Sequence, residues 1–361
     1  MPETVSPPTL AAIAIGRNEG VRLAACLAAL KGEVGRIVYV DSGSTDDSVA
    51  IARAAGAEVV DLDLSVPFTA ARARNAGIDA LAGQAGRFQG APARDPERAP
   101  RPSPGGSTPP GDGPPQAGAP PDLVQFVDGD CEIQPGWIAT ARAFLETTPE
   151  AAVACGRRRE RFPEASVYNR LCDAEWDTPV GRATACGGDA LMRWSAVAEV
   201  GGFNPAIIAG EEPDLCVRLR SAGWEIWRLD AEMTLHDAAM TRFVQWWRRT
   251  RRAGHAFAEG AHRHGHLPER FWVAETRRAL LWGTALPVAA FAGALVSPWT
   301  LLLLLAYPAQ ILRLARRAGG DRFAAEQALF LVLGKIPESL GVLEFHGRRL
   351  FGRPSGLIEY K

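Results

Sequence analysis

The 361-residue sequence lacks the patterns that mark several common protein classes. Its six cysteines stand singly with no C-x-x-C pair, which argues against a zinc or thiol-exchange motif, and we expect reduced, buried thiols. No basic residue precedes Arg17 and no apolar run of signal length opens the chain, so we expect no cleaved secretion signal. Positive charge is not in excess, since 40 basic residues face 41 acidic ones, and we expect no nucleic-acid partner.

Two enzyme signatures are missing as well. The first apolar run ends in AIGRNEG rather than in G-x-G-x-x-G, which argues against a Rossmann dinucleotide site. No G-x-S-x-G elbow is present, so we expect no covalent serine nucleophile. What remains is an ordinary globular composition, with 47% hydrophobic and 22% charged residues, which excludes a wholly disordered or collagen-like chain.

Short apolar runs alternate with helical stretches in the first part of the sequence. Strands are predicted at residues 9–15, 36–40, 58–60 and 123–128, with helices between and after them that include residues 69–81 and 135–148. This order predicts an α/β fold with a mostly parallel sheet and flanking helices. In such a fold the functional loops lie at the carboxyl ends of the strands.

A tract rich in proline, glycine and alanine interrupts this pattern at residues 83–121. It has no apolar periodicity and too few hydrophobic residues to order itself, which predicts a disordered surface insertion. The alternative is a proline-rich ligand for a partner domain. Because the sheet pattern resumes directly after the tract, we assign residues 1–240 to one domain.

Two aspartates follow the strand at residues 123–128 in the segment VDGDCE. Side chains two apart on an extended segment point to the same side, so we expect the carboxylates of Asp128 and Asp130 to converge. Paired carboxylates beside a glycine suit Mg²⁺ or Mn²⁺ bound to a diphosphate. The alternative is an ordinary Asp-Gly hairpin turn.

Three acids open a predicted helix in the segment GEEPDLCVRL. Glu211, Glu212 and Asp214 either stabilise the helix N-terminus electrostatically or supply a general base for an attacking hydroxyl. A further acid, Asp41, ends a strand in VDSGSTDDS, at the sheet edge where α/β proteins bind ligands. There its carboxylate can accept hydrogen bonds from a base or a ribose.

The last third of the sequence is apolar and basic. Residues 241–278 mix arginines with aromatic residues, which predicts an interfacial segment for a membrane surface. Residues 279–296 and 299–312 carry no charge and arginines flank their outer ends, which predicts a helical membrane hairpin over residues 279–316 with both ends in the cytoplasm. Two full spans, a shallow re-entrant hairpin and a buried hairpin are the alternatives. A helical tail is predicted over residues 317–361.

The motifs occur in the order found in family 2 glycosyltransferases of the GT-A fold, which residues 10–236 resemble. IGRNEG, VDSGSTDDS, ARARNAG and VDGD are similar to that family's opening strand end, nucleotide-binding loop, arginine-asparagine segment and metal-binding pair. GGDALMR, VGGF and GEEPDLCVRL resemble its acceptor-side and base-bearing segments. The resemblance implies a GT-A-like fold and an inverting enzyme of the membrane-associated bacterial type.

The resemblance also implies roles for individual residues. Contacts with the donor or the metal are implied for Asp41, Arg74, Asp128, Asp130 and His236. An acceptor side is implied for Gly188, Asp189, Glu211, Gln245 and Arg248. Glu212 matches the general base, with glutamate in place of the usual aspartate, and Asp214 is the alternative base. For His236 the alternative is an ordinary loop histidine.

The sequence therefore predicts a metal-dependent glycosyltransferase at the cytoplasmic face of the inner membrane. It would move a sugar from a nucleotide-sugar donor to a hydroxyl of a glycan or lipid-linked acceptor, with Mg²⁺ or Mn²⁺ as cofactor. We expect the product to serve a cell envelope polysaccharide. A nucleotidyltransferase on a related fold and a non-catalytic glycan-assembly scaffold are the alternatives.

Overall fold

The computed structural model describes residues 9–84, 86–88 and 119–352. The chain forms two compact units. The first extends to residue 161 and resumes over residues 173–238, and the second comprises residues 162–172 and the chain from residue 239 onward. Most of the insertion predicted at residues 83–121 lies outside the described residues.

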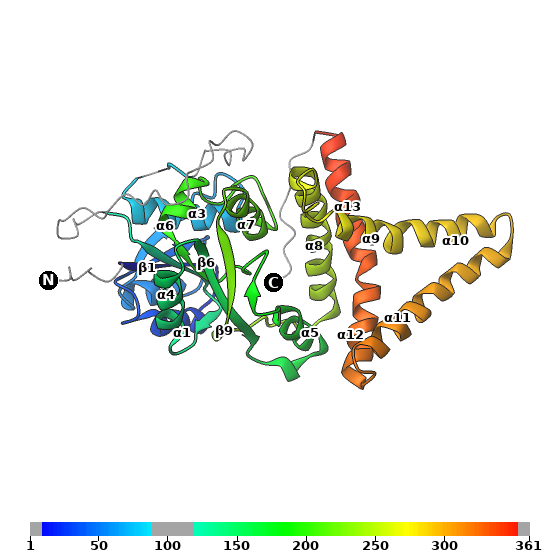
Figure 1. Ribbon diagram of the computed structural model, residues 1–361, viewed down its shortest axis with the longest axis horizontal. Helices are drawn as coiled ribbons and strands as arrows, with labels where there is room; N and C mark the ends of the chain where they lie inside the picture. The colour runs from blue at the N-terminus through cyan, green and yellow to red at the C-terminus, as the bar shows by residue number, and fades with distance from the viewer. Residues whose placement is uncertain (1–8, 85, 89–118, 353–361) are drawn as a thin grey trace. The chain divides into compact units, whose positions relative to one another are not determined.

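A nine-stranded sheet forms the centre of the first unit (Figure 1). The order of the strands is β3-β2-β1-β4-β8-β6-β9-β5, and β7 pairs with β9. The strands are β1 (Leu10–Gly16), β2 (Arg36–Asp41), β3 (Glu58–Asp61), β4 (Leu123–Asp128), β5 (Cys131–Ile133), β6 (Ala151–Glu160), β7 (Gly181–Arg182), β8 (Ala190–Arg193) and β9 (Glu225–His236).

The part of the sheet from β3 to β4 has the parallel arrangement that the alternating sequence predicts. β1 pairs in parallel with both β2 and β4, and β2 pairs in parallel with β3. In this register Gly16 lies opposite Asp41 and the preceding residue of β1, Ile15, lies opposite Asp128. The carboxyl ends of β2 and β4 therefore reach the same edge of the sheet, on either side of β1.

Beyond β4 the sheet is mixed, which corrects the expectation of a mostly parallel sheet. β8 runs antiparallel to β4 and to β6, whereas β6 and β9 are parallel. β5 pairs with β9 and, in the described sheet, not with β4, so the Asp-Gly step after β4 is not a hairpin turn. β5 and β8 have three and four residues, which is too short for hydrophobic periodicity to reveal them.

Helices cover the sheet of the first unit. They are α1 (Val21–Leu30), α2 (Ser48–Ala54), α3 (Ala70–Ala82), α4 (Trp137–Thr147), α6 (Trp194–Glu199) and α7 (Glu211–Ser221). Between β6 and β7 the chain also forms a 3₁₀ turn, η2 (Pro163–Ala165), and α5 (Val167–Trp176). α3 begins where the Thr69 hydroxyl accepts a hydrogen bond from the Arg72 amide, and it ends at Gly83 in the left-handed conformation.

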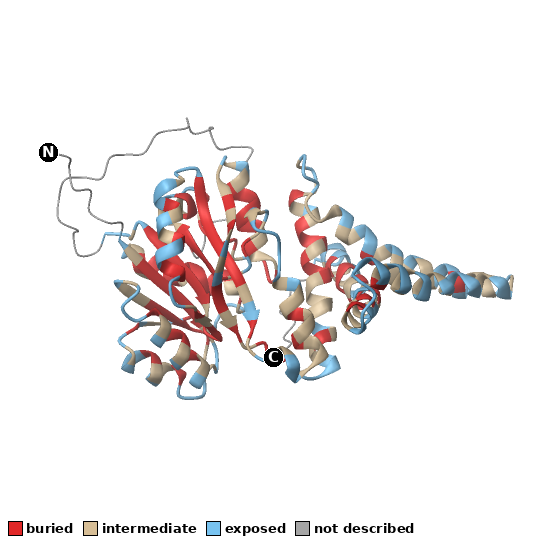
Figure 2. Cartoon of the chain, turned by 60° about the horizontal axis from the view of Figure 1, so that its bottom comes forward, coloured by how far each residue is buried: buried red, intermediate tan, exposed pale blue. Residues whose placement is uncertain are grey.

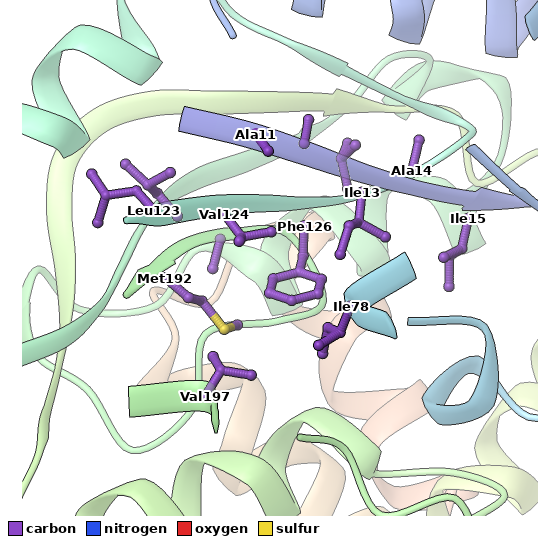
Figure 3. Packing of buried hydrophobic residues seen from close by; sticks show 14 of the residues in the cluster. Ala11, Ile13, Ala14, Ile15, Ile78, Leu123, Val124, Phe126, Met192 and Val197 are labelled. Atoms are coloured by element: carbon purple, nitrogen blue, oxygen red, sulfur yellow. The ribbon is translucent and has the colours of Figure 1, made fainter. Parts of the chain in front are cut away.

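Apolar side chains from β1, β4, β8 and α3 pack together in the core of the first unit (Figure 3). The rings of Phe126 and Phe203 meet edge to face with their centroids 5.3 Å apart. A methyl group on Gly77 would overlap Ile13, so this glycine lets α3 lie close against β1. All six cysteines are buried thiols outside any disulfide, as the sequence predicts.

The second unit is helical. Its main elements are α8 (Phe243–His264), α9 (Val273–Leu280), the π-helical turn η3 (Leu281–Ala285), α10 (Leu286–Ala294), the 3₁₀ helix η4 (Pro298–Leu305), α11 (Ala306–Arg317), α12 (Arg322–Leu333) and α13 (Lys335–Leu350). α8 and α13 cross in close contact, because a methyl group on Gly254 would overlap the Glu338 carbonyl and one on Gly341 would overlap the Arg251 carbonyl.

An apolar helical hairpin extends from this unit. α9, η3 and α10 follow one another without a break, and η4 continues directly into α11. The two arms meet in a turn, and most of their residues are exposed or half-buried (Figure 2). Among the described residues, one helix, Pro298–Arg317, is long and apolar enough to cross a membrane, and only 6% of its apolar window is buried.

Candidate active site

Asp41, at the end of β2, is buried and fixes the loop that follows. The Tyr39 hydroxyl donates to Asp41 Oδ1 at 3.1 Å, and the amides of Gly43 and Ser44 donate to Oδ2 at 2.9 and 2.8 Å. Burial and the neighbouring Asp41 carboxylate raise the pKa of Tyr39, so its hydroxyl keeps the proton that it donates. The carboxylate thus holds the loop after β2 at the sheet edge that the sequence predicts for donor binding.

Asp128, at the end of β4, lies at the centre of a chain of alternating charges. Arg74 of α3 donates to Asp128 Oδ1 at 2.8 Å and to Glu211 Oε1 at 2.7 Å. On the other side, Nη2 of Arg158 in β6 lies 3.5 Å from Asp128 Oδ2 and 2.6 Å from Asp189 Oδ2. We call these five residues the charge chain. It joins side chains from β4, β6, α3, α7 and the segment before β8.

Both arginines of the charge chain are buried and remain charged. Burial alone lowers the pKa of a guanidinium, but Asp128 and Glu211 raise the pKa of Arg74 above its usual value. Burial likewise lowers the pKa of Arg158, but the neighbouring carboxylate of Asp189 raises it by more, so the pKa lies above its usual value. Three carboxylates against two guanidiniums leave the charge chain net negative, which favours a cation nearby.

Asp189 is fully buried and organises the charge chain. Its carboxylate accepts hydrogen bonds from the Asp128 amide at 3.0 Å, from Arg158 Nε at 3.0 Å and from the Thr234 hydroxyl at 2.9 Å. The preceding Gly188 has a left-handed φ of 70°, and a side chain there would press on Arg74, Arg158 and Asp128. These two residues of the predicted acceptor side therefore lie directly beside Asp128.

Asp130 and His236 form a second group. His236 Nε2 lies 3.4 Å from Asp130 Oδ1, and Nδ1 lies 3.7 Å from Glu160 Oε2. The antiparallel pairing of β5 with β9 sets Cys131 opposite His236, which explains how residues so far apart in the sequence meet. Asp130, Cys131 and His236 offer ligand atoms within 4.8 Å of one another, as do Asp128, Cys131 and Asp189. The two predicted metal aspartates thus lie in separate groups that share Cys131.

Glu212, the predicted general base, faces the interior. Its Oε1 accepts a hydrogen bond from the Cys186 amide at 2.6 Å and lies 3.0 and 2.9 Å from the sulfurs of Cys186 and Cys216. Only 5% of the residue is exposed. Asp214, the alternative base, is 3% exposed and forms a buried ion pair with Arg218 at 2.8 Å.

Glu211 is the acid of α7 that belongs to the charge chain. Its carboxylate bonds to Arg74, which bonds in turn to Asp128, and 14% of its side chain is exposed. The start of α7 therefore directs three neighbouring acids to three different surroundings. Of the three, Glu211 is the one that shares a guanidinium, that of Arg74, with Asp128.

Gln245 and Arg248, the two remaining residues predicted for the acceptor side, lie at the start of α8, in the second unit. Gln245 Oε1 accepts hydrogen bonds from the amides of Thr241 and Arg242 at 3.0 Å each, so its side chain caps the helix. Arg248 is exposed. Their assignment to the acceptor side stays a prediction.

Sequence reasoning missed Arg158, Glu160 and Trp176. The indole of Trp176 meets the His236 ring edge-on, with centroids 4.8 Å apart, and the Arg158 guanidinium lies 5.4 Å from its centroid. Arg158 stands in the run RRRE, which looks like an ordinary basic surface segment. Its partner Asp189 is 31 residues away, so no local spacing signals the pair.

No protein-family model matches this sequence, and no curated protein sequence matches it significantly. A likeness to solved structures is clear. The mannosyltransferase PcManGT from Pyrobaculum calidifontis, in complex with GDP-Man and Mn²⁺, is 18% identical with a TM-score of 0.59, covering 95% of this chain and 90% of that one. Glucosyl-3-phosphoglycerate synthase from Mycobacterium tuberculosis, in complex with Mn²⁺, UDP and glucosyl-3-phosphoglycerate, is 18% identical with a TM-score of 0.45, covering 72% and 80%.

The likeness to the mannosyltransferase concerns the fold and extends over nearly the whole chain. The α/β fold that the sequence predicts, with a central sheet and flanking helices, is confirmed by it and by the strand order of the first unit.

Proposed function

We propose that this protein is a metal-dependent glycosyltransferase that moves a sugar from a nucleotide-sugar donor to an acceptor hydroxyl with inversion. The observation that carries the proposal is the charge chain around Asp128 at the carboxyl end of β4, together with Cys131, which lies near Asp128 and Asp189 on one side and near Asp130 and His236 on the other. A negative cluster at that sheet edge suits a cation that accompanies a diphosphate. The mannosyltransferase with this fold is described with GDP-Man and Mn²⁺, which supports the same class of donor here.

The donor set of Asp130 and His236 fits Mg²⁺ or Mn²⁺. Asp130 Oδ1 and His236 Nε2 lie 3.4 Å apart, so both could hold the same cation. His236 Nδ1 faces Glu160 and has no hydrogen-bond partner among the described residues. With the proton on Nδ1, the lone pair of Nε2 points at the carboxylate of Asp130. These two electron-rich atoms repel each other unless both bind the same cation. When bound, the ion would offset the charge that develops on the departing nucleoside diphosphate.

The residues of the sheet edge hold the donor in this proposal. Asp41, fixed by Tyr39 and the loop amides, presents the edge at which the donor base binds. Arg74 and Arg158 hold the Asp128 carboxylate between them. Asp189 binds the Asp128 amide and Arg158 together, so the end of β4 cannot move independently of β6.

We place the proton acceptor on Glu211. The resemblance points to Glu212, and that assignment stays a prediction, but the Glu212 carboxylate is occupied by Cys186 and Cys216 inside the protein. Glu211 is partly exposed, and the guanidinium of Arg74 bonds to both Glu211 and Asp128. A carboxylate at this position can accept the proton of an attacking hydroxyl.

We further propose that the second unit attaches the enzyme to the cytoplasmic face of the inner membrane, where a glycan or lipid-linked acceptor is available. The exposed apolar hairpin supports this, as does the one candidate span found among the described residues. Arginines adjoin both ends of the hairpin and complement anionic lipid headgroups.

A donor screen tests the proposed reaction. The purified full chain in detergent is incubated with individual nucleotide sugars and Mg²⁺ or Mn²⁺, and we expect metal-dependent release of a nucleoside diphosphate from at least one of them. Asp130→Asn should abolish this release, and Asp230→Asn, at an exposed position of β9, should not. A parallel incubation with nucleoside triphosphates and sugar 1-phosphates tests the alternative, and release of pyrophosphate there, without nucleoside diphosphate release from any nucleotide sugar, would identify a nucleotidyltransferase. Nucleotide binding without any turnover across the screen would favour the non-catalytic scaffold.

A further inference from the structure

The hairpin exposes large apolar side chains along both arms and at its turn. These side chains belong to Leu281, Val288, Phe291, Leu295, Val296, Trp299, Leu302, Leu305 and Leu312. Val296 and Leu295, at the turn, are 92% and 89% exposed, more than any other large apolar residue in the described ranges. A continuous apolar surface of this kind marks contact with another protein or with lipid.

Several backbone amides of the turn, and the Thr300 hydroxyl, are hydrogen-bonded within the hairpin itself. The backbone amides involved belong to Leu295, Val296, Ser297 and Thr300, and they donate to the carbonyls of Ala292, Gly293 and Ser297. The Thr300 hydroxyl lies 3.0 Å from the Ala290 carbonyl and 2.9 Å from the Ser297 carbonyl. Between the arms the Tyr307 hydroxyl donates to the Trp282 carbonyl. A turn in water does not require this, whereas in hydrocarbon every unpaired polar group is costly.

The turn itself is tightly built. A methyl group on Gly293 would press on Thr300, so this glycine allows the two arms to approach where they meet. The pair Gly293 and Thr300 thus closes the turn without any charged side chain. The nearest charged residues are Arg278 before the turn and Arg313 after it.

The charge-free arms are shorter than the hydrocarbon core of a bilayer. Residues 279–294 rise about 24 Å as a helix. Residues 298–312 rise about 26 Å, because the 3₁₀ helix η4 rises about 2.0 Å per residue and the α-helical part about 1.5 Å. The hydrocarbon core is about 30 Å thick. If the arginines at both outer ends stay in the headgroups of one leaflet, the turn ends within the hydrocarbon.

We infer that this hairpin is re-entrant: it enters the bilayer from the side of its flanking arginines, and its turn at residues 295–300 stays in the hydrocarbon without reaching the opposite aqueous phase. The partner is a lipid bilayer with anionic headgroups. Its headgroups face Arg277 and Arg278 on one arm and Arg313, Arg316 and Arg317 on the other. The inference rests on the proposed membrane attachment and extends it to depth and topology.

Cysteine labelling in sealed vesicles tests the depth of the turn. Val296→Cys reports on the turn, and Ala318→Cys, at an exposed position just after α11, reports on the base of the hairpin. The parent protein is the background control because its six cysteines are all buried. Inside-out and right-side-out membrane vesicles are treated with a membrane-impermeant maleimide, before and after detergent.

We expect Ala318→Cys to react in inside-out vesicles only, and Val296→Cys to react in neither kind until detergent is added. Reaction of Val296→Cys in right-side-out vesicles would replace the inference with two full spans. Its reaction in inside-out vesicles, or recovery of the protein without membranes, would place the hairpin outside the bilayer. Because labelling does not depend on turnover, a failed donor screen leaves this result unaffected.

A charge at the turn gives an independent measurement. Val296→Arg, whose side chain stays charged at alkaline pH, should shift much of the full-length protein from the membrane pellet to the supernatant after alkaline extraction, whereas Val296→Ala should stay in the pellet as the parent does. Equal recovery of both variants in the pellet, together with labelling from the far side, would overturn the re-entrant arrangement.

Discussion

The clearest test of the proposed chemistry compares the two neighbouring glutamates at the start of α7. Glu211→Gln keeps the size of the side chain and an oxygen for Arg74, but the amide cannot accept a proton. Loss of a general base costs about 10² to 10⁴ in rate. Because Asp128 continues to hold Arg74 at 2.8 Å, we expect nucleotide affinity to change by no more than a few-fold.

Glu212→Gln should act on stability rather than on rate. Oε1 of Glu212 has three neighbouring donors, the Cys186 amide and two thiols, and no cation lies among its hydrogen-bond partners. A hydrogen bond to a charged group contributes about 1.5 to 3 kcal/mol to the stability of the fold, and one between neutral groups about 1 kcal/mol. Burying an amide costs less than burying a carboxylate, which offsets part of this difference. We therefore expect a loss of about 1 kcal/mol, a Tm lowered by about 2 to 4 °C, and turnover within a few-fold of the parent.

The assay measures turnover at saturating donor and acceptor, nucleotide affinity, and thermal unfolding for both variants. Glu33→Gln, at an exposed position after α1, is the control for loss of one negative charge. A collapse of turnover in Glu212→Gln with parental Tm and nucleotide affinity would refute our assignment and move the base to Glu212. Near-parental turnover in both variants would remove the glutamates of α7 from the mechanism.

Two further predictions concern the second unit, measured by thermal unfolding of the full chain in detergent. Burial lowers the pKa of His255 from 6.5 to about 4, so the unfolded chain takes up a proton below pH 6.5 that the folded chain does not. Stability should fall by about 3 kcal/mol from pH 6.5 to 4, and His255→Leu should lose this slope; equal slopes would contradict the assignment. Gly254→Ala should destabilise by about 1 to 3 kcal/mol because it overlaps the Glu338 carbonyl, whereas Gly347→Ala, in open space on α13, should be neutral or stabilising. Similar effects of both alanines would show that the α8 and α13 crossing tolerates a methyl group.

The sequence was informative where local periodicity is strong. The alternation through β1, β2, β3 and β4 predicted the parallel part of the sheet, and α3 and α4 begin and end within two residues of the predicted helices. β5 and β8 escaped prediction because three or four residues carry no measurable period. Their pairing depends on partners far along the chain, which only the folded sheet specifies.

The place of the candidate site residues in the fold was predictable to the same degree. Asp41, Asp128 and Asp130 could be assigned to the edge of the sheet because each stands at or just after the end of a recognisable strand. The contacts of Arg158 and Asp189 were not, because the two residues meet through neighbouring strands rather than through local spacing. A charged residue buried by such a long-range partner looks, in the sequence alone, like any surface arginine.

For the acids of α7, the helical period gives information that the motif alone does not, because it determines which side of the helix each acid faces. Consecutive residues of a helix point about 100° apart, so Glu211 and Glu212 cannot both face the same neighbour. Residues three, four and seven after Glu212 are Leu215, Cys216 and Leu219, and all three are fully buried. That spacing puts Glu212 on the apolar face of α7, and its carboxylate finds the Cys186 amide there. Glu211 is turned away from this face, toward Arg74. The motif assigns the base to Glu212 or Asp214, whereas the helical period turns Glu211 toward the charge chain.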